Sequence, residues 1–200
     1  MLQHFRPALV MLVLFTALTG IIYPYALTGF ASAVLPAQAN GSLIVDTKGA
    51  IIGSSLIGQA VTSDRYFQPR PSATSAPDPK DASKTVDAPY NAINSSGSNL
   101  GPTSQALVDR VKAAVEAKRT SGWQGAIPAD AVTTSASGLD PHVSPQYALA
   151  QVAGVAKARG LDEAKVTALV EAKTEGRFLG VVGEPRGNVL ALNLALDQIK

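Results

Sequence analysis

The sequence predicts an α+β fold, with a single N-terminal transmembrane helix followed by one compact extracytoplasmic α+β domain. Residues 7–45 carry no charged side chain, and an apolar run of that length is long enough to cross a bilayer as a helix. Residues 42–61 hold short β-branched and apolar runs separated by glycines, which is typical of strands and turns. Between residues 103 and 173, apolar side chains recur at three- and four-residue intervals, which indicates amphipathic helices.

The N-terminal run also predicts the topology. Arg6 precedes the run, and no further Lys or Arg follows until Lys48. Because basic residues stay on the cytoplasmic side of a membrane, we expect residues 1–6 in the cytoplasm, 7–34 as the transmembrane helix and its extension, and 41–200 as an exported domain. The expected location is the cell inner membrane, crossed once, with the soluble domain in the periplasm.

Two features of this run leave alternatives open. The sequence "AQA" at residues 37–39 has the form of a cleavage site, so the segment is either a retained anchor or a signal peptide. The apolar core of a signal peptide usually spans about 7 to 15 residues, which is shorter than this run, so a retained anchor is favoured. Pro24 would clash with the carbonyl four residues back, so we expect the helix to kink or to end near Tyr23.

The exported part is predicted to begin with a strand, a tight turn and a second strand within residues 42–61. The segment that follows, 68–89, contains five prolines and almost no large apolar side chain, so we predict a Pro-rich surface loop. Two interpretations of this loop stay open. It is either a disordered linker or a binding loop held down at its ends by Tyr66 and Phe67 before it and Tyr90 after it.

Three helices are predicted after this loop, each with a capping residue or a stop signal. Their expected limits are Thr103 or Ser104 to about Gly122, Pro145 to about Arg159 with Gly160 as the stop, and Asp162 as N-cap to about Lys173. The C-terminal segment "NVLALNLALDQIK" fits a strand by the alternation of its leucines and a helix by their four-residue spacing. The pattern does not decide between the two.

Composition excludes several classes of function. The formal net charge is +2, from 17 basic and 15 acidic residues, and this balance argues against a nucleic-acid partner. The chain has no cysteine and only two histidines, which excludes disulfides, thiol catalysis and multi-histidine metal sites. It has no phosphate-binding "GxxxxGK[ST]" loop despite its 17 glycines. We therefore expect no metal and no tightly bound cofactor.

The stretch "SASGLDPHVSP" places Ser137, Asp140, His142 and Ser144 close together in the sequence. A hydrolase that uses Ser137 or Ser144 with His142 is one interpretation, but triad members normally converge from separate elements of the fold. Each residue also has a local role, because Asp and Pro open turns, Ser caps helices and Pro suits the first helical position. The structural or interface interpretation is therefore favoured.

The turn "GEPRGN" at residues 183–188 offers Arg186 as an anion contact and Glu184 as its ion-pair partner. A surface turn with an ion pair is the favoured interpretation, because nothing in this turn resembles a phosphate-binding loop.

Several motifs, taken in order, resemble a known family. They are the apolar span, "YFQPRPSA", "YN…SSGSNLGP", "TSASGLDPHVSP", "ARGL" and "LGVVGEPRGNVLALNLALD". Together they resemble the C subunit of the bacterial Kdp potassium-transporting ATPase over nearly the whole chain. Two turns depart from the family pattern: Ser96 stands where a second glycine is usual, and Gly187 stands where a valine is usual.

The resemblance implies a non-catalytic subunit of a high-affinity, ATP-driven potassium uptake complex. Its partners would be a potassium-binding pore subunit and a P-type ATPase subunit. The family is also described as a catalytic chaperone that raises the ATP affinity of the ATPase subunit, which makes ATP a ligand by implication. Because a domain exported beyond Val45 does not meet cytoplasmic nucleotide, we favour stabilisation of the complex, or gating of ion entry, as the mechanism. The alternatives are a membrane-anchored periplasmic hydrolase and a stand-alone binding module.

On this resemblance, small or hydroxylated residues of the span would pack against partner helices, and the turn motifs would either contact partner subunits or shape their own loops. The candidates in the span are Thr16, Thr19 and Gly20. The candidates in the turn motifs are Arg70, Pro71, Ser72, Asn91, Ser98, Asn99, Gly101, Pro102, Ser137, Gly138, Asp140, Pro141, His142, Ser144, Glu184, Pro185, Arg186 and Asn188.

Overall fold

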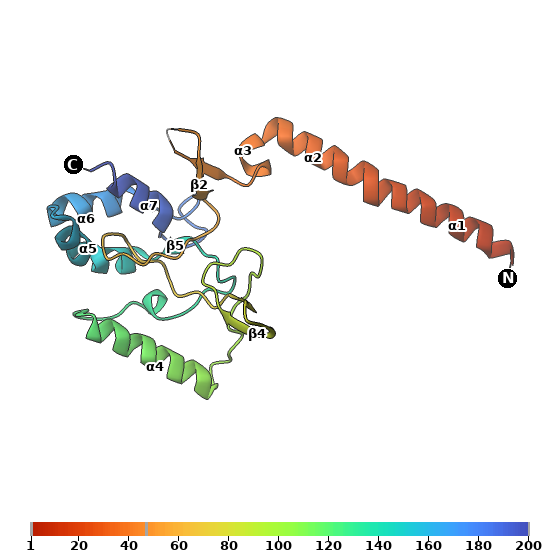
Figure 1. The fold of residues 1–200 in the computed structure, drawn as a ribbon. Helices are drawn as coiled ribbons and strands as arrows, with labels where there is room; N and C mark the ends of the chain where they lie inside the picture. Colours follow the sequence, from red (N-terminus) through yellow and green to blue (C-terminus); the bar gives the residue numbers. More distant parts are fainter. Residues whose placement is uncertain (1, 47, 200) are drawn as a thin grey trace. The chain divides into compact units, whose positions relative to one another are not determined.

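The computed structural model describes residues 2–46 and 48–199, and the chain divides into two compact units, Met1–Ser54 and Ser55–Lys200. Helices and strands occur in both units (Figure 1), which confirms the predicted mixture of the two. The first unit holds the long N-terminal helix and a small two-stranded sheet. The second unit holds the remaining strands and helices, and the hydrophobic core lies in it.

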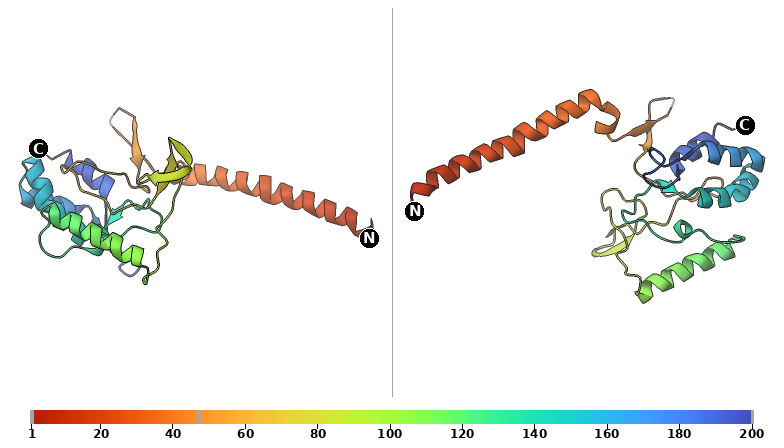
Figure 2. Two further views of the ribbon diagram at one scale, coloured as in Figure 1. Left: turned by 60° about the horizontal axis from the view of Figure 1, so that its bottom comes forward. Right: turned by 180° about the vertical axis from the view of Figure 1, so that it is seen from behind.

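The N-terminal helix consists of α1 (Leu2–Ala17), the π-helical turn η1 (Leu18–Ile22) and α2 (Tyr23–Val34). The helix spans Gln3–Val34, 32 residues, and its most apolar 18-residue window has a mean hydropathy of 2.0, so it is long and apolar enough to cross a membrane. Its most apolar part is not buried against the rest of the chain. Figures 1 and 2 show these elements as one continuous helix.

Pro24 does not end this helix. The N–H of Tyr23 donates to the carbonyl of Leu18, five residues back, so the turn just before the proline is wider than an α-helical turn. A π turn of this kind accommodates a proline because it relieves the crowding between the ring and the preceding carbonyls. The expected helix end near Tyr23 is therefore wrong, and α2 continues to Val34.

A short helix, α3 (Pro36–Ala39), precedes the predicted strand pair. Strand β1 (Leu43–Val45) pairs antiparallel with β2 (Ile51–Ser54), as the glycine-separated apolar runs predicted. The carboxylate of Asp46 closes the turn, because its Oδ1 accepts from the N–H groups of Lys48 and Ala50, both at 2.8 Å.

The segment 68–89, predicted as a surface loop, contains a β-hairpin. Strand β3 (Ser75–Asp78) pairs antiparallel with β4 (Asp81–Asp87), and most of β4 is exposed. The sequence argument considered only apolar side chains, whereas a hairpin satisfies its backbone groups by cross-strand hydrogen bonds and tolerates proline on an edge strand. The disordered-linker interpretation is therefore wrong for this part of the segment.

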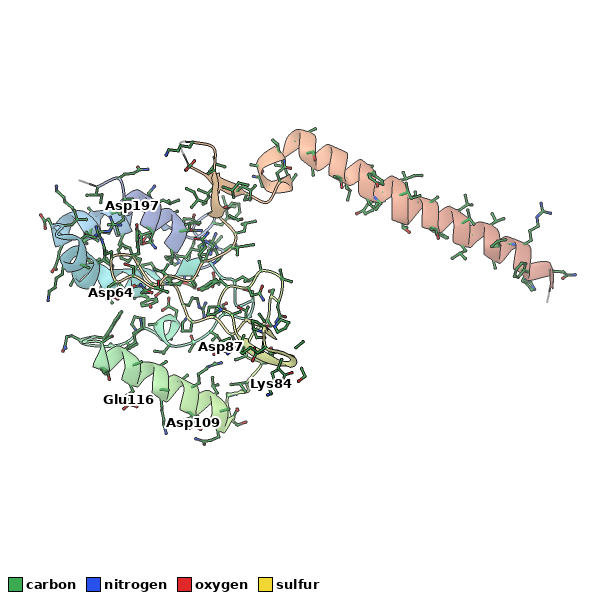
Figure 3. All side chains as sticks on the ribbon, viewed as in Figure 1. Asp64, Lys84, Asp87, Asp109, Glu116 and Asp197 are labelled. Carbon is green, nitrogen blue, oxygen red and sulfur yellow. The ribbon has the colours of Figure 1, made fainter. Side chains whose placement is uncertain are left out.

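The three predicted helices form at nearly the expected residues. They are α4 (Gln105–Thr120), α5 (Pro145–Arg159) and α6 (Glu163–Ala172), with a short 3₁₀ turn, η2 (Ala129–Ala131), before α5. The caps of α5 and α6 are those the sequence predicted: Ser144 accepts from the N–H of Tyr147 and Asp162 from that of Ala164, while Gly160 has φ +68°. Ser104 stands at the N-cap of α4, but its side chain makes no capping hydrogen bond, so the predicted side-chain cap of this helix is wrong. Along α4, Asp109 and Glu116 lie on the exposed part of the helix (Figure 3).

The C-terminal segment is helical. Strands β5 (His142–Val143), β7 (Arg186–Asn188) and β6 (Thr174–Glu175) form a three-stranded sheet in that order, and α7 (Val189–Leu196) follows β7 directly. Asn188 caps α7 by accepting from the N–H of Ala191 at 3.0 Å. Leu192 and Leu196 are both buried in the core, so the four-residue spacing is the one that the fold uses.

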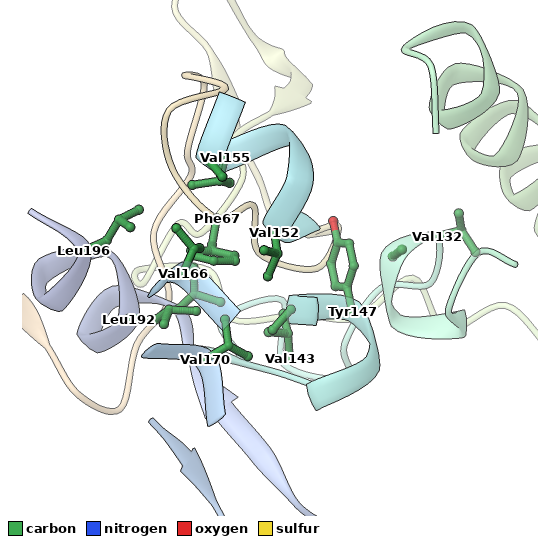
Figure 4. Close-up of a cluster of buried hydrophobic side chains, with 14 residues drawn as sticks. Phe67, Val132, Val143, Tyr147, Val152, Val155, Val166, Val170, Leu192 and Leu196 are labelled. Carbon is green, nitrogen blue, oxygen red and sulfur yellow. The ribbon is translucent and has the colours of Figure 1, made fainter. Parts of the chain in front are cut away.

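The core of the second unit gathers around Phe67, which is fully buried among side chains of α5, α6 and α7 (Figure 4). Two buried amide side chains hold the backbone at this point. Asn193 accepts from the N–H of Phe67 at 2.8 Å and donates to its carbonyl at 3.0 Å, and Gln151 makes the same pair of bonds to Gln68, at 2.6 and 3.2 Å. These hydrogen bonds fix the backbone at residues 67 and 68, and therefore the start of the segment that carries Arg70.

Candidate functional site

Three segments that carry predicted site residues pack against one another. Ser72 donates its hydroxyl to the carbonyl of Gly138 at 2.7 Å and accepts from the N–H of Tyr90 at 3.1 Å. Ser95 donates to the carbonyl of Ser137 at 3.0 Å. The segments around residues 72, 95 and 137 therefore form one hydrogen-bonded cluster, although they are far apart in the sequence.

Glycines allow this close approach. Gly138 has φ +67°, and a Cβ there would lie 2.5 Å from Thr74 Cγ2 and 2.6 Å from the carbonyl oxygen of Ser96. A Cβ on Gly97 would lie 2.6 Å from the carbonyl oxygen of Ala136. A side chain at either glycine would push the two backbones apart.

Arg70, Asp140 and His142 form the polar centre of the cluster. Arg70 Nη1 lies 3.0 Å from Asp140 Oδ2, and Arg70 Nη2 donates to the carbonyl of Thr134 at 3.3 Å. The other carboxylate oxygen of Asp140 accepts from the backbone N–H of His142 at 3.0 Å and lies 3.3 Å from its Nδ1. All three side chains are about a quarter exposed, at 24%, 28% and 24%, so water screens this cluster only in part.

The electrostatics of the cluster favour the ionised carboxylate. Burial alone would raise the pKa of Asp140, but hydrogen bonds from the side chain and backbone of His142 and the charge of Arg70 hold that pKa below its ordinary value. Burial raises the pKa of Tyr90, whose hydroxyl donates to the carbonyl of Arg70 at 2.7 Å. Tyr90 thus stays neutral and fixes the backbone that carries the arginine.

A cleft of about 800 Å³ opens beside this centre. Its lining includes apolar residues such as Ile127, Pro128 and Val143, and its ionisable residues are Arg70, Asp130, Asp140, His142, Glu184 and Arg186. This lining does not fit ATP, because three carboxylates would face the phosphates. Both guanidinium groups are also already paired, Arg70 with Asp140 and Arg186 with Glu175 at 3.2 Å.

The serines of the motif have structural partners. Ser144 donates its hydroxyl to Asp130 at 3.1 Å and accepts from the N–H of Tyr147 at 3.1 Å, while Ser137 accepts from the N–H of Leu139 at 3.1 Å. Within the described part of the chain, neither serine is hydrogen-bonded to His142. The Asp–His contact of a triad is present, but the contact between nucleophile and base is not.

The ion pair predicted for the "GEPRGN" turn is wrong. Glu184 pairs with Arg177, whose Nη2 donates to both carboxylate oxygens at 2.8 and 2.9 Å, and Arg186 pairs with Glu175 across β6 and β7. The antiparallel pairing of β6 and β7 places residues 175 and 186 opposite each other, which brings Glu175 within reach of Arg186.

The other predicted residues have varied surroundings. Asn91 donates to the carbonyl of Ser75 at 2.8 Å, Asn188 donates to that of Ser55 at 2.8 Å, and the carbonyl of Pro141 accepts from the N–H of Val189 at 2.9 Å. These contacts join loops within the domain. Pro185 is exposed and lines the cleft, and Pro71 and Ser98 are half-buried.

The remaining predicted residues lie outside the cluster. Asn99, Gly101 and Pro102 are exposed ahead of α4. In the N-terminal helix, Thr16 and Gly20 are exposed, and the hydroxyl of Thr19 donates to the carbonyl of Phe15 at 2.6 Å.

Sequence reasoning missed two polar residues that hold the cluster together. Thr74 is 2% exposed; it donates to the carbonyl of Ala88 at 2.6 Å and accepts from the N–H of Asn91 at 3.1 Å. Asp130 accepts from the N–H of Ser144 at 2.6 Å. Thr74 also contacts the hydroxyl of Ser72 at 3.0 Å, but its partners Ala88 and Asn91 and the partner of Asp130, Ser144, lie 14 or more positions away, so local spacing does not reveal these contacts.

The comparisons with known proteins identify the family of this chain. A family model described as the c chain of the K⁺-transporting ATPase, KdpC, matches residues 5–198. The chain belongs to the KdpC family. The resemblance seen in the sequence motifs is thereby confirmed.

Curated KdpC relatives are similar along their whole length. The potassium-transporting ATPase KdpC subunit of Methylobacterium nodulans is 60% identical over 199 residues, which cover 100% of this chain and 98% of the relative. The KdpC subunits of Rhodopseudomonas palustris strain BisB5 and Bradyrhizobium diazoefficiens are 60% and 58% identical, over 98% and 99% of this chain and 98% of each relative.

Both departures from the KdpC pattern fit the geometry. A Cβ on Gly187 would meet nothing within 4 Å, so the position has room for the start of a larger side chain. Ser96 is half-buried and contributes its carbonyl, not its side chain, to the close approach with Gly138. Neither departure disturbs the cluster that the other KdpC motifs build.

Proposed function

We propose that this protein is the accessory, non-catalytic subunit of an ATP-driven potassium uptake complex, and that it stabilises and assembles that complex. The partners are a potassium-binding pore subunit and a P-type ATPase subunit. The observation that carries the proposal is the KdpC match over residues 5–198, which includes both the apolar helix and the domain. The curated relatives are named as subunits of a potassium-transporting ATPase.

The geometry supports a structural role for the motif residues. The guanidinium group of Arg70, the carboxylate of Asp140 and the hydroxyls of Ser72 and Ser144 bond to other parts of the same domain. A catalytic subunit would instead direct such groups at a substrate. The cluster therefore holds three long loops in one defined surface, which is what a docking subunit needs.

The proposed location is the cell inner membrane, with the N-terminus in the cytoplasm and the folded domain in the periplasm. The apolar helix over Gln3–Val34 supports a retained anchor because its length suits a bilayer span better than a signal peptide. Arg6 at its start and Lys48 beyond its end support the orientation.

The effect on ATP affinity implied by the family is proposed to be indirect. The cleft presents three carboxylates and two already paired arginines, so nucleotide bound to this chain is not part of the proposal. A subunit contact that favours one conformation of the ATPase subunit would change its ATP affinity without touching ATP, because coupling requires only differential contact with two states.

Two experiments on the full chain test the proposal. Co-purification in mild detergent through a tag after Lys200 should recover the pore and ATPase subunits, whereas a stand-alone binding module would be recovered alone. Protease added to spheroplasts should digest the domain while the cytoplasmic N-terminus stays intact. A domain protected until the membrane is opened would refute the periplasmic location but not the association.

The hydrolase alternative keeps one supporting observation, the 3.3 Å contact between His142 and Asp140. If the purified chain hydrolysed a panel of ester and peptide substrates, and His142→Ala abolished that activity, the non-catalytic role would be wrong. We expect no hydrolysis to begin with, because the described structure gives His142 no serine partner.

A further inference from the structure

An exposed apolar turn projects from the three-stranded sheet between β6 and β7. All residues from 175 to 186 are exposed, and the centre of this turn, "FLGVVG" at 178–183, has no charged side chain. Its large side chains are among the most exposed apolar groups of the second unit: Phe178 71%, Leu179 81%, Val181 74% and Val182 61%. We call these four residues the apolar tip. A contiguous exposed apolar group of this kind marks an interaction site.

The apolar tip is a hydrogen-bonded turn. The N–H of Phe178 donates to the carbonyl of Val182 at 2.8 Å, and the N–H of Val182 returns a bond to Phe178 at 3.0 Å. At the base, Arg177 is held by two bonds to Glu184. A surface already fixed in shape loses little conformational entropy when it binds, so this turn is prepared for a partner.

Contacts within the chain do not explain the backbone conformation of Leu179. Its φ is +52°, a left-handed conformation that glycine or asparagine adopts more easily than leucine. It gains no burial in return, since it is 81% exposed. Strain at an exposed apolar residue is explained when a partner buries that side chain.

The charges around the apolar tip favour a protein partner over lipid. Loops that insert into membranes rely on unpaired basic residues to attract anionic headgroups. Both arginines of this turn are paired, Arg177 with Glu184 and Arg186 with Glu175. The turn therefore presents an apolar centre and a neutralised polar rim, which is the pattern of a protein interface.

The small size of the apolar tip further restricts which partners it can bind. Four side chains offer much less than the about 800 Å² per partner of a typical specific interface, so the tip needs a partner already held beside it. The cleft beside this turn has apolar residues such as Ile127 and Val143, but it also holds the carboxylates of Asp130, Asp140 and Glu184. A second copy that placed its apolar tip there would remove these carboxylates from water, which is unfavourable.

We propose that the apolar tip inserts into an apolar pocket on a membrane subunit of the same complex, with Leu179 as the central anchor. This rests on the proposed function, since the shared membrane is what keeps the two proteins adjacent. The contact is then a second attachment point, and it gains strength from the high effective concentration that the N-terminal helix provides.

The test uses the full chain in mild detergent, titrated against the other subunits of the complex produced without it. Leu179→Asn removes the anchor but suits the left-handed backbone, so it should raise or preserve the thermal unfolding temperature of the chain. The apparent Kd should rise about tenfold, because a buried leucine is lost. Ile93→Asn is the matched control, since Ile93 is 98% exposed on another loop, and its Kd should equal that of the wild type.

The outcomes separate the two proposals. If the wild-type chain does not bind the other subunits at all, the proposed function is wrong and the docking fails with it. If the wild type binds and Leu179→Asn binds equally well, only the docking is wrong. Self-association of the chain alone that Leu179→Asn abolishes would assign the tip to a second copy and overturn the inference. Quenching of a fluorophore at residue 179 by brominated lipid, with the assembled complex in a bilayer, would show that the tip contacts lipid and would also overturn the inference.

Discussion

The guanidinium of Arg70 lies 3.0 Å from the carboxylate of Asp140, although 70 positions separate them in the chain. This contact joins the proline-rich segment after Phe67 to the loop before α5. Both side chains are only about a quarter exposed, so each would be left as a poorly solvated charge without the other.

Replacement of Arg70 should therefore destabilise the domain. We expect Arg70→Met to lower the free energy of unfolding by about 2 kcal/mol, because it leaves the Asp140 carboxylate without its charged donor. Arg186→Met is the control: its pair with Glu175 is more than half exposed, at 54% and 57%, so the cost should be about 0–1 kcal/mol. Urea unfolding of the full chain in detergent measures both. Equal losses would contradict this account of the Arg70 pair.

Stability should fall in acid in a way that depends on Asp140. Because the pKa of Asp140 in the folded chain lies below its ordinary value of 3.8, the unfolded chain binds more protons as the pH falls. The contribution of Asp140 is therefore complete above pH 3.8 and is lost as the pH falls through the lower, folded pKa. In urea unfolding from pH 7 downward, Asp140→Asn should show a shallower loss than the wild type. Asp109→Asn, on the exposed part of α4, is the control and should keep the wild-type slope.

Gly138 should not tolerate a side chain. Gly138→Ala places a methyl group 2.5 Å from Thr74 and 2.6 Å from the Ser96 carbonyl, in addition to the strain of φ +67°. The expected loss is about 2–5 kcal/mol, from backbone strain and overpacking together. Gly125→Ala separates the two causes: Gly125 has φ +76° and open space around it, so about 1–2 kcal/mol is expected. Thermal unfolding would contradict the close-approach argument if both variants lost the same amount.

Asn193 should contribute to the stability of the domain more through its two hydrogen bonds than through its volume. Asn193→Leu keeps the size of the side chain but leaves the buried N–H and carbonyl of Phe67 without partners, so a loss of about 2–4 kcal/mol is expected. Asn94→Leu removes an exposed amide that donates to Ser75, and should cost less than about 1 kcal/mol. Calorimetry on the two variants tests the difference, and a tolerated Asn193→Leu would refute it.

The sequence was sufficient for the local features. The uncharged apolar run predicted the long helix, and Ser144, Gly160 and Asp162 predicted the limits of α5 and the start of α6, because capping and chain reversal depend on neighbouring residues. Several motifs together also indicated the KdpC family, which the match over residues 5–198 confirms.

The sequence was insufficient wherever a residue's partner lies far along the chain. The leucines of the C-terminal segment fit a strand and a helix equally well, and the burial of Leu192 and Leu196 against the core decides for the helix. The partner of Arg186 proved to be Glu175 across a strand pair, not Glu184 two residues away.

Local sequence thus determined the long apolar helix, the caps of α5 and α6 and the family, whereas the tertiary structure decided how the site is assembled. The reason is physical. A helix cap or an apolar span depends on groups within a few residues, so a short stretch of sequence is enough to predict it. The contact between Arg70 and Asp140, the close approach at Gly138 and the burial of Thr74 depend on loops that meet only once the core around Phe67 has formed.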